Sequence, residues 1–461
     1  MKKNVCIIVV SILCPVLSFA QAMGVAGGGI TESRSAVTSI SDGGIIAPFQ
    51  YIAPVDEDAT KKENTPPRSR VQQRIMDLNN AGDYQTAGTE GVSLMATEKL
   101  DDELQLIVAN SLAWTGRVKE AVPVYQGISK GPYANQANLG LANINRWRGR
   151  DDLAKPVYQS ILEKDASNMD AQEGLALAKR ELSPRTTLTA GVSEDSSNLK
   201  RRLGAVNHRW RDQTGANIFE VESSGFYDWM PTDAEAQRDL TLRYQGLALP
   251  LKPSLELNMP TRLNPSLYGT AKIKLLDDLV TLGAGRINWG KAVANPIAER
   301  QGLSASYLSA EIMQSFTMGS LTGRVNYYGV SDGNVILTTG LDFNSAWRPF
   351  GSHFKPFAGV ETRSAQKNVS TYWSPAQGSG SIYAGLMGEW SDADWSFFAS
   401  AQLGAPLFGD AGSSWSVSAG GKHWLTNDIA LGMNLWSMAS WRDNATYRAR
   451  SLNVNLEKLW N

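Results

Sequence analysis

The feature that most constrains this chain is the alternation of apolar and polar residues in its C-terminal part. At the start of IALGMNLWSMASW, large apolar residues occupy every second position, so these side chains fall on one face of an extended strand. These apolar residues are Ile429, Leu431, Met433 and Leu435. Ala430, Gly432 and Asn434 fall on the other face. A strand that is apolar outside and polar inside is typical of a transmembrane β-barrel.

The segment SLNVNLEKLWN repeats this pattern at the end of the sequence. Asn453, Asn455 and Glu457 lie on one face, and the opposite face carries Leu452, Val454, Leu456 and Trp460. An amphipathic last strand with an aromatic residue resembles the signal that the outer-membrane barrel-assembly machinery reads, although Trp460 is penultimate rather than last. The resemblance implies that this machinery is a partner, and that the four apolar residues form the strand it recognises.

We expect the barrel to occupy residues 186–461, because the helical texture stops at Ser183-Pro184. Turn-forming residues divide this range at 195–198, 331–334, 378–381 and 410–413. At about 17 residues per strand plus turn, it holds about 16 strands around an aqueous lumen. Of 14 tryptophans, all but Trp114 and Trp147 lie here, as interfacial girdles require. A soluble β-sandwich or propeller is the alternative, but it leaves the terminal aromatic strand unexplained.

Residues 71–182 have a helical period and an internal repeat. Small residues and tyrosines recur 33 positions apart, as Ala109 and Ala142, Ala121 and Ala154, and Tyr125 and Tyr158. This spacing resembles tetratricopeptide repeats, in which small residues let paired helices approach and an aromatic side chain fills the gap to the next unit. We therefore predict an α plus membrane β chain that begins with a short helical solenoid and a concave docking face. A plain helical hairpin bundle is the alternative.

The N-terminal residues predict export. Lys2 and Lys3 precede an apolar stretch that ends at the small-x-small site Ser18-Phe19-Ala20, so residues 1–20 are interpreted as a signal peptide. A single membrane anchor is the alternative. Residues 21–70 are rich in Gly, Ser, Thr and Pro and are predicted to be a flexible linker. Both cysteines lie in the signal, so we expect no disulfide, thiol catalysis or cysteine-bound metal in the mature chain.

Charge and motif patterns exclude several functions. The chain has 44 Lys and Arg against 45 Asp and Glu, which gives no electrostatic reason to expect nucleic acid as a partner. His208, His353 and His423 stand in no HxxxH or HExxH spacing, and no nucleophile or phosphate-loop motif has its required context. We therefore expect no catalytic residue, no metal and no cofactor. A barrel enzyme acting on lipid A or polysaccharide remains an alternative.

The architecture and two short motifs resemble the outer-membrane export porins for cellulose and poly-N-acetylglucosamine. The motifs are Ser331-Asp332-Gly333-Asn334 and Tyr372-Trp373-Ser374-Pro375. The resemblance implies a duct for an exopolysaccharide of the biofilm matrix, with Asp332, Asn334, Tyr372, Trp373 and Ser374 along the passage or at its mouth. Ordinary turn and girdle roles are the alternative for these residues. The chain departs from the family in having far fewer repeats.

This interpretation predicts a location and partners. We expect the barrel in the cell outer membrane and the helices in the periplasm, where they dock the polymer or the periplasmic or inner-membrane synthase components. A surface receptor or adhesin scaffold without transport is the alternative. Acidic groups, Glu194 with Asp195 and Asp228 with Asp233 and Glu235, are either attractors for a cationic polymer or solvated loop residues. Arg448 and Arg450 are expected to meet lipopolysaccharide phosphates or to pair with carboxylates in the lumen.

Overall fold

The computed structural model describes residues 68–460, apart from residues 232, 262–265, 277, 294, 317, 348–353, 370, 376, 392–393 and 443–444. The expected signal peptide and almost all of the expected linker lie outside the described residues, as does His353. The chain divides into two compact units. One contains Gly149–Asp152 and Ala176–Asn461, and the other contains most of the helices.

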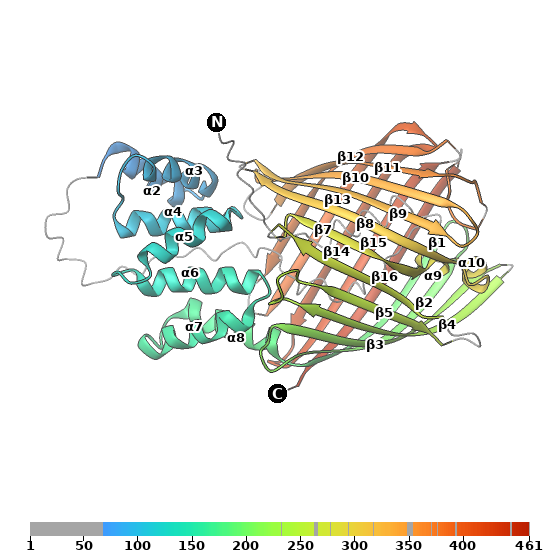
Figure 1. Cartoon of the computed structure of the whole chain (residues 1–461), viewed down its shortest axis with the longest axis horizontal. Coiled ribbons are helices and arrows are strands. Elements are labelled where there is room, and N and C mark those ends of the chain that lie inside the picture. Colours follow the sequence, from blue (N-terminus) through green and yellow to red (C-terminus); the bar gives the residue numbers. More distant parts are fainter. Residues whose placement is uncertain are drawn as a thin grey trace. The chain divides into compact units, whose positions relative to one another are not determined.

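Seven helices precede the first strand in the described part of the chain (Figure 1). They are α2 (Arg70–Asn80), α3 (Tyr84–Met95), α4 (Asp102–Trp114), α5 (Val118–Ile128), α6 (Ala134–Trp147), α7 (Asp151–Lys164) and α8 (Met169–Leu182). Side chains cap several of them: Ser69 forms a capping box with Gln72 at the start of α2, and Asp101 accepts from the Leu104 N–H at the start of α4. The predicted helical range of 71–182 is confirmed.

The internal repeat of 33 residues reappears in the packing. Ala109, Ala121, Ala142 and Ala154 are fully buried. The hydroxyl of Tyr125 donates to Asn110 Oδ1 at 2.6 Å, and that of Tyr158 donates to Asn143 Oδ1 at 2.7 Å, so the same bond recurs one repeat later. Glycines let the tyrosines pack closely, because a Cβ on Gly140 or Gly174 would stand 2.5 Å from a tyrosine ring. Assignment of these helices to the tetratricopeptide class stays a prediction.

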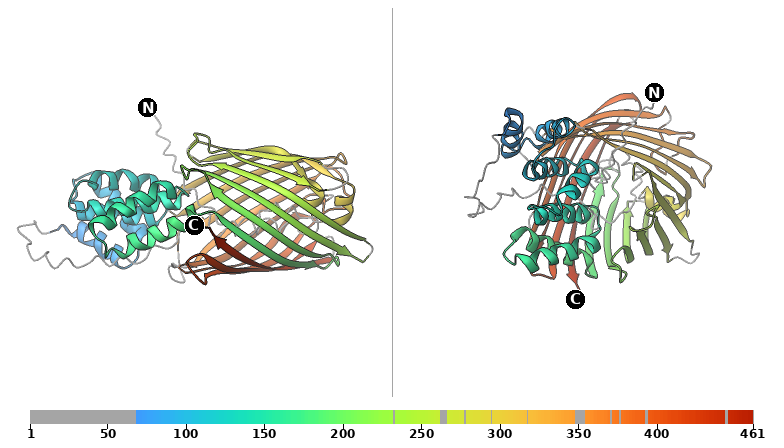
Figure 2. Two further views of the ribbon diagram at one scale, coloured as in Figure 1. Left: turned by 90° about the horizontal axis from the view of Figure 1, so that it is seen from below. Right: turned by 60° about the vertical axis from the view of Figure 1, so that its left-hand side comes forward.

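Sixteen antiparallel strands form a closed barrel (Figures 1 and 2). The strands are β1 (Arg185–Asp195), β2 (Lys200–Arg211), β3 (Asn217–Met230), β4 (Asp233–Gly246), β5 (Ser254–Pro260), β6 (Tyr268–Leu275), β7 (Val280–Asn288), β8 (Ser304–Phe316), β9 (Gly319–Val330), β10 (Val335–Ser345), β11 (Phe354–Ala365), β12 (Ser379–Ser391), β13 (Trp395–Gly409), β14 (Ala411–Trp424), β15 (Ile429–Arg442) and β16 (Ala445–Leu459). Each strand pairs with its sequence neighbour, and β1 closes the ring against β16 from Arg185↔Leu459 to Asp195↔Ala449. The predicted barrel and its strand number are confirmed.

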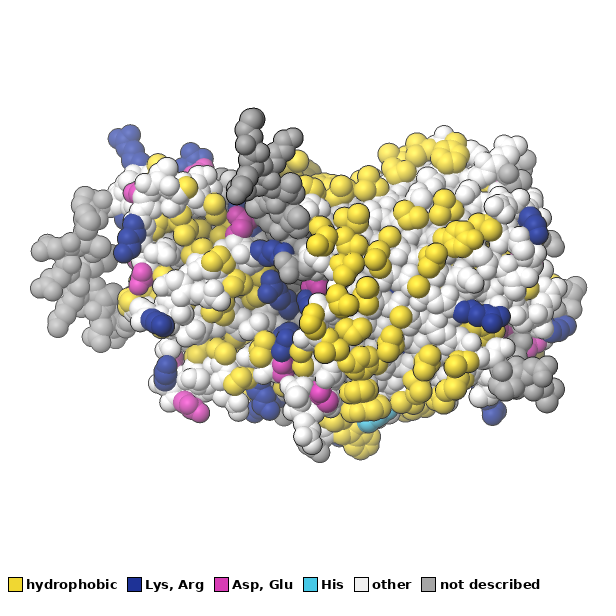
Figure 3. Space-filling model, in the orientation of Figure 1, with side chains coloured by type: hydrophobic (Ala, Val, Ile, Leu, Met, Phe, Trp, Pro, Cys, Tyr) yellow, Lys and Arg dark blue, Asp and Glu magenta, His cyan; other side chains and the backbone are white. Residues whose placement is uncertain are grey.

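The two faces of the wall differ as the alternation predicts. On β16, Leu452, Val454 and Leu456 are 40%, 40% and 43% exposed on the outside, whereas Asn455 and Glu457 are 6% and 7% exposed on the inside. Leu431, Met433 and Leu435 face outward on β15 in the same way. Apolar side chains spread over the outer face of the barrel in Figure 3. No helix in the described ranges is long and apolar enough to span a membrane.

The two rims of the barrel are named here by what they carry. The chain-end rim holds Arg185 and Leu459, and the loop rim holds the longer connections 289–303 and 366–378. Aromatic side chains gather near the chain-end rim, where the rings of His208, Trp210, Phe219 and Tyr244 follow one another at centroid distances of 5.6, 5.7 and 5.3 Å. Trp395 stacks on His423 at 3.8 Å. This arrangement is typical of an interfacial girdle.

Two of the four predicted turns are wrong in extent. Residues 379–381 belong to β12, where Ser379 pairs with Gly409 and a register shift follows Gly380. Residues 411–413 belong to β14, which leaves only Asp410 between β13 and β14. Gly and Ser fit a β-bulge in a barrel wall as well as they fit a turn, so composition alone misplaced these boundaries. The turns after Asp195 and after Ser331 are where they were predicted.

A charge on the outer face should cost much more than a charge on the inner face. Val454→Arg places a guanidinium in the apolar belt and should destabilise the barrel by about 2–4 kcal/mol. Asn453→Arg, its neighbour on the inner face, is the control and should cost clearly less. Urea unfolding from lipid bilayers measures both. Equal losses for the two variants would contradict the assignment of the faces.

Candidate passage through the barrel

Charged side chains on the inner wall neutralise one another across neighbouring strands. The Arg243 guanidinium of β4 contacts Glu222 at 2.9 Å, Glu256 at 2.8 Å and also Glu220. Arg201 and Asp228, opposite one another on β2 and β3, are 2.6 Å apart. Arg324 Nη1 lies 2.5 Å from Asp342 Oδ2 on β10. Buried charges are stable when they are paired and hydrogen-bonded. The Arg201 and Arg324 pairs leave no net charge, whereas the three carboxylates around Arg243 leave that cluster net negative.

The inner face of β13–β16 has a different chemistry, which we call the neutral strip. It consists of hydroxyl and amide side chains at Ser400, Gln402, Ser416, Ser418, Asn434, Ser451 and Asn455. Ser400 and Ser418 hydrogen-bond to each other at 2.7 Å. Among the described side chains on the inner face of these strands, the charged ones are Lys422 and Glu457, which pair at 2.8 Å toward the chain-end rim.

Several polar atoms of the neutral strip are buried without a hydrogen-bond partner among the described residues. They are Gln402 Oε1, both amide atoms of Asn434, Ser451 Oγ and Asn455 Oδ1. Gly420, directly opposite Asn434, makes room for this amide, since a Cβ there would lie 2.2 Å from Asn434 Oδ1. Buried amides and hydroxyls are costly to leave unsatisfied, so these groups are suited to partners that pass through the lumen.

The connection between β7 and β8 folds into the barrel. It contains α9 (Trp289–Ala292) and α10 (Pro296–Arg300). From α9, Lys291 Nζ reaches Asp239 Oδ2 on the inner face of β4 at 2.5 Å and lies over the Phe226 ring of β3. The Arg300 guanidinium of α10 donates to the Ala234 carbonyl at 3.0 Å. This segment therefore narrows the lumen near the loop rim, where the yellow coils stand inside the strands in Figure 1.

Aromatic residues fix this inner segment to the wall. Trp289 is fully buried, and its ring lies 5.3 Å from Tyr328 and 5.4 Å from Tyr372. Trp289 therefore departs from the predicted girdle, because it packs inside the loop rim. Its neighbours in this cluster include Tyr307, which stacks on Tyr328 at 5.4 Å.

The two sequence motifs meet in space at the loop rim. The Tyr372 hydroxyl donates to Asp332 Oδ2 at 2.7 Å and accepts from Asn334 Nδ2 at 3.2 Å. The Asn334 side chain also bonds the backbone of Lys367 in both directions, at 2.9 Å each. Gly333 has φ +80°, which gives the turn a conformation that residues with a side chain rarely adopt. These residues join the 331–334 turn to the 366–378 connection; a role in passage stays a prediction.

Trp373 and Ser374 hold the same connection in place. The Trp373 carbonyl accepts from Arg363 on the inner wall at 2.9 Å, and the Arg363 guanidinium lies 5.5 Å from the Trp373 ring. The Ser374 hydroxyl accepts from the Val369 N–H at 2.7 Å. Burial, and the hydrogen bond to Asp332, raise the pKa of the Tyr372 phenol. Tyr372 therefore keeps its proton, and its bond to Asp332, at physiological pH.

The acidic and basic residues singled out in the sequence have specific partners. Asp228 is buried and paired with Arg201, so it is neither a solvated loop residue nor an open attractor. Glu194 pairs with Arg450, and Asp195 Oδ2 accepts from the Tyr447 hydroxyl at 2.7 Å. The remaining charges are Glu235, which lies 3.6 Å from Arg300, and Asp233, whose side chain is not described. Arg450 and Arg448 are exposed on the outer face, so pairing within the lumen is wrong for both.

We looked for clusters of metal-binding side chains in the described ranges. No group of three or more His, Cys, Asp or Glu residues there could hold a metal ion. His208 Nδ1 contacts the Thr186 hydroxyl at 3.0 Å on the outer face, and His423 stacks on Trp395.

Comparisons with known proteins give only structural likeness. A scan against protein-family models gives no match, and a search of the curated proteins gives none. Similar solved structures include "Bacterial polysaccharide outer membrane secretin", with 11% identity and a TM-score of 0.49, covering 61% of this chain and 99% of that one. Pseudomonas aeruginosa OccK5 (OpdH) has 11% identity and a TM-score of 0.33, with 60% and 98% covered. CdiB from Acinetobacter baumannii has 9% identity and a TM-score of 0.37, with 59% and 60% covered.

The wall itself defines the class of protein. Closed antiparallel barrels that are apolar outside and polar inside belong to outer membranes, because every backbone polar group is paired within the ring. This chain therefore has the closed antiparallel barrel fold that is typical of outer-membrane proteins.

Breaking the contact between the inner segment and the wall should open the passage. Lys291→Met removes the cation from Asp239, whose side chain is fully buried, and loss of one partner of such a pair costs about 3–5 kcal/mol. We expect a larger and noisier single-channel conductance in planar bilayers. Lys291→Arg keeps the charge and should behave like the wild type. Unchanged conductance in Lys291→Met would show that the segment does not restrict the lumen.

Acid should weaken the ion cluster at the chain-end rim. Burial by itself would raise the pKa of Glu181, but three nearby guanidinium groups outweigh it and hold this pKa at about 2, against an ordinary value of 4.5. They belong to Arg185, Arg209 and Arg211. Because the folded pKa is lowered, the stabilisation is complete above about pH 5 and is lost as pH falls toward 2.

Glu181→Gln therefore should cost on the order of 1–3 kcal/mol at pH 7 and much less near pH 2. Urea unfolding in detergent micelles at several pH values measures the difference. Glu163→Gln, at an exposed position of the preceding helix α7, is the control. A cost that does not change with pH would contradict the lowered pKa.

Proposed function

We propose that the barrel is an outer-membrane exit duct for a polysaccharide of the cellulose or poly-N-acetylglucosamine class, used in a biofilm matrix. The observation that carries the proposal is the neutral strip, with amide and hydroxyl atoms that have no partner among the described residues. Sugar hydroxyls and acetamido groups both donate and accept hydrogen bonds, so successive sugar units can satisfy these atoms in turn when the buried side chains rotate from the wall toward the lumen.

A moving polymer needs many weak contacts rather than one strong site. Each neutral hydrogen bond contributes only about 0.5–1.5 kcal/mol, so a sugar unit held by one or two of them exchanges readily. The opposite wall supports this role, because Arg243 and Arg201 are occupied by carboxylates, so neither guanidinium is free to retain an anionic chain. A neutral or weakly charged polymer fits this lumen best.

The proposal also assigns roles to the two rims, the helices and the contacts of the two sequence motifs. Short turns at the chain-end rim support a periplasmic position for this rim, and the longer connections support an outward position for the loop rim. The helices are proposed to dock the polymer or components of a periplasmic or inner-membrane synthase, which supplies the driving force. The Asp332, Asn334 and Tyr372 contacts would then shape the exit rather than bind the polymer directly.

Block of the ion current by oligosaccharides tests the proposal. Cello-oligosaccharides and chito-oligosaccharides are added to the reconstituted protein, and the affinity of block is measured. Asn434→Ala with Asn455→Ala should weaken the block by about 2- to 12-fold per amide. Asn326→Ala, which removes an amide of β9 that already bonds Thr338, is the control and should leave the block nearly unchanged.

The outcome also separates the polymers and the alternatives. Stronger block by one oligosaccharide series identifies the polymer class. A conducting barrel that neither series blocks would refute the proposal. A barrel that does not conduct, even with Lys291→Met, would favour a receptor or adhesin scaffold. This is the second candidate because the ion pair between Lys291 and Asp239 holds the inner segment inside the barrel.

A further inference from the structure

Cations gather on the outer face of the barrel where the apolar belt ends near the loop rim. In the register, Leu452, Val192, Arg202, Tyr227 and Ala236 form one outward row across β16, β1, β2, β3 and β4. The next row toward the loop rim contains Arg450 and Lys200, and the next row toward the chain-end rim contains Arg238. Arginines therefore stand at the border between hydrocarbon and water on every second strand of this part of the wall, β16, β2 and β4.

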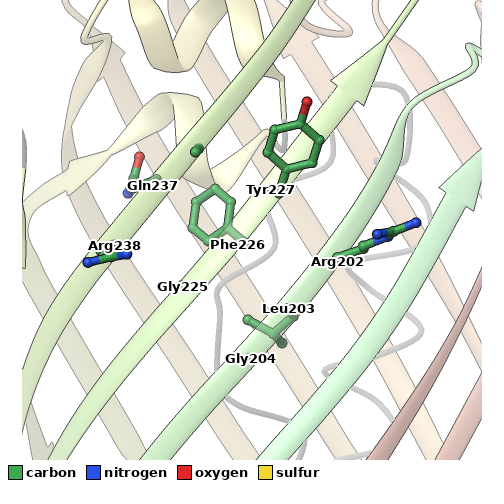
Figure 4. Close-up of a pocket in the computed structure, with 9 residues that line it drawn as sticks. Arg202, Leu203, Gly204, Gly225, Phe226, Tyr227, Gln237 and Arg238 are labelled. Atoms are coloured by element: carbon green, nitrogen blue, oxygen red, sulfur yellow. The ribbon is translucent and has the colours of Figure 1, made fainter.

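A groove of about 360 Å³ lies between two of these arginines. Gly204 and Gly225 form its floor on the outer face, and Arg202, Tyr227 and Arg238 surround it (Figure 4). A Cβ on Gly204 would meet nothing within 4 Å, which shows that the space above it is open. By contrast, Val192 and Val206, next to the groove, are 54% and 48% exposed. The glycines thus interrupt the wall of larger apolar side chains.

No carboxylate in the described part of the barrel neutralises the arginines at the groove, so both can bind an external anion. Arg202 and Arg238 form no ion pair with any side chain in the described part of the barrel, whereas Arg201, on the inner face, is paired. Lys200 lies 5.4 Å above the Trp229 ring. Glu194, the carboxylate in the row of Arg450 and Lys200, forms an ion pair with Arg450. The outer face therefore carries an excess of positive charge beside an apolar groove.

We infer that this groove binds a phosphorylated glycolipid of the outer leaflet, the lipid A part of lipopolysaccharide. Guanidinium groups bind phosphate oxygens in a bidentate manner, and cations at the membrane border select anionic head groups. Strand spacing places the Arg202 and Arg238 backbones about 12 Å apart, so the two guanidinium groups can bind the phosphates of one head group from opposite sides. The Gly204 and Gly225 floor then accepts an acyl chain, with Tyr227 at the level of the head group. The inference rests on the outer-membrane location and not on the polymer.

Lipid binding to the full chain in a detergent micelle tests the inference, with native mass spectrometry as the readout. The probes are bisphosphorylated lipid A, its phosphate-free form and phosphatidylglycerol. We expect the bisphosphorylated form to bind at least tenfold more tightly than the other two. Arg202→Gln with Arg238→Gln should lower this affinity at least tenfold. Lys99→Gln with Lys130→Gln changes the net charge equally at exposed sites in the connections between the helices and should have no effect.

A second variant tests the groove independently of the arginines. Gly225→Leu fills it, and the Cβ meets its nearest neighbours at 3.7 and 3.8 Å, so the strand can accept the change. We expect severalfold weaker lipid A binding with both arginines present. Equal binding of phosphate-free lipid A or of phosphatidylglycerol, or full binding by both variants, would overturn the inference. Because this readout measures lipid and not current, its failure leaves the proposed transport function standing.

Discussion

Closure of β1 against β16 is the interaction on which the rest of the structure depends. A lipid bilayer offers no water to an exposed N–H or C=O, so a spanning sheet must pair all of its edges. The continuous register from Arg185↔Leu459 to Asp195↔Ala449 removes the last two edges. Once the ring is closed, alternation along each strand assigns every side chain to lipid or to the lumen, and the chemistry of both surfaces follows from that assignment.

Polar side chains on the inner surface are arranged in two different ways. On one side, carboxylates and guanidinium groups pair across neighbouring strands, as in Arg243 with Glu222 and Glu256. On β13–β16, the amides of Asn434 and Asn455 have space beside glycine and carry atoms without a hydrogen-bond partner in the described part of the chain. The first arrangement occupies the guanidinium groups of the wall, and the second leaves hydrogen-bonding capacity for whatever occupies the lumen. Their combination favours a neutral, hydroxyl-rich polymer over an ion.

Much of the fold could be predicted from the sequence because alternation is a local signal. The phase of β15 and β16, the approximate strand number and the start of the barrel after Ser183-Pro184 all depend on residues close together in the chain. Turn limits at 378–381 and 410–413 could not be predicted, since Gly and Ser serve both bulges and turns. The pairing of Asp228 with Arg201 was also out of reach, because it depends on the register between β2 and β3.

The candidate site could also be predicted from the sequence only in part. Sequence analysis placed Asn434 and Asn455 on a polar face, which is the signal that could have located the neutral strip, but nothing local shows that Gln402 shares their surface. The contact between Asp332 and Tyr372 joins residues forty positions apart, so it appears only in the folded chain.

The most direct test of the central claim is the accessibility of single cysteines placed along β16 from Leu452 to Glu457, with the protein in membranes. A charged, water-soluble thiol reagent should label positions 453, 455 and 457, which face the wet lumen, and should spare positions 452, 454 and 456, which face lipid. Labelling at every position, or the opposite phase, would contradict a lipid-embedded barrel with an aqueous interior.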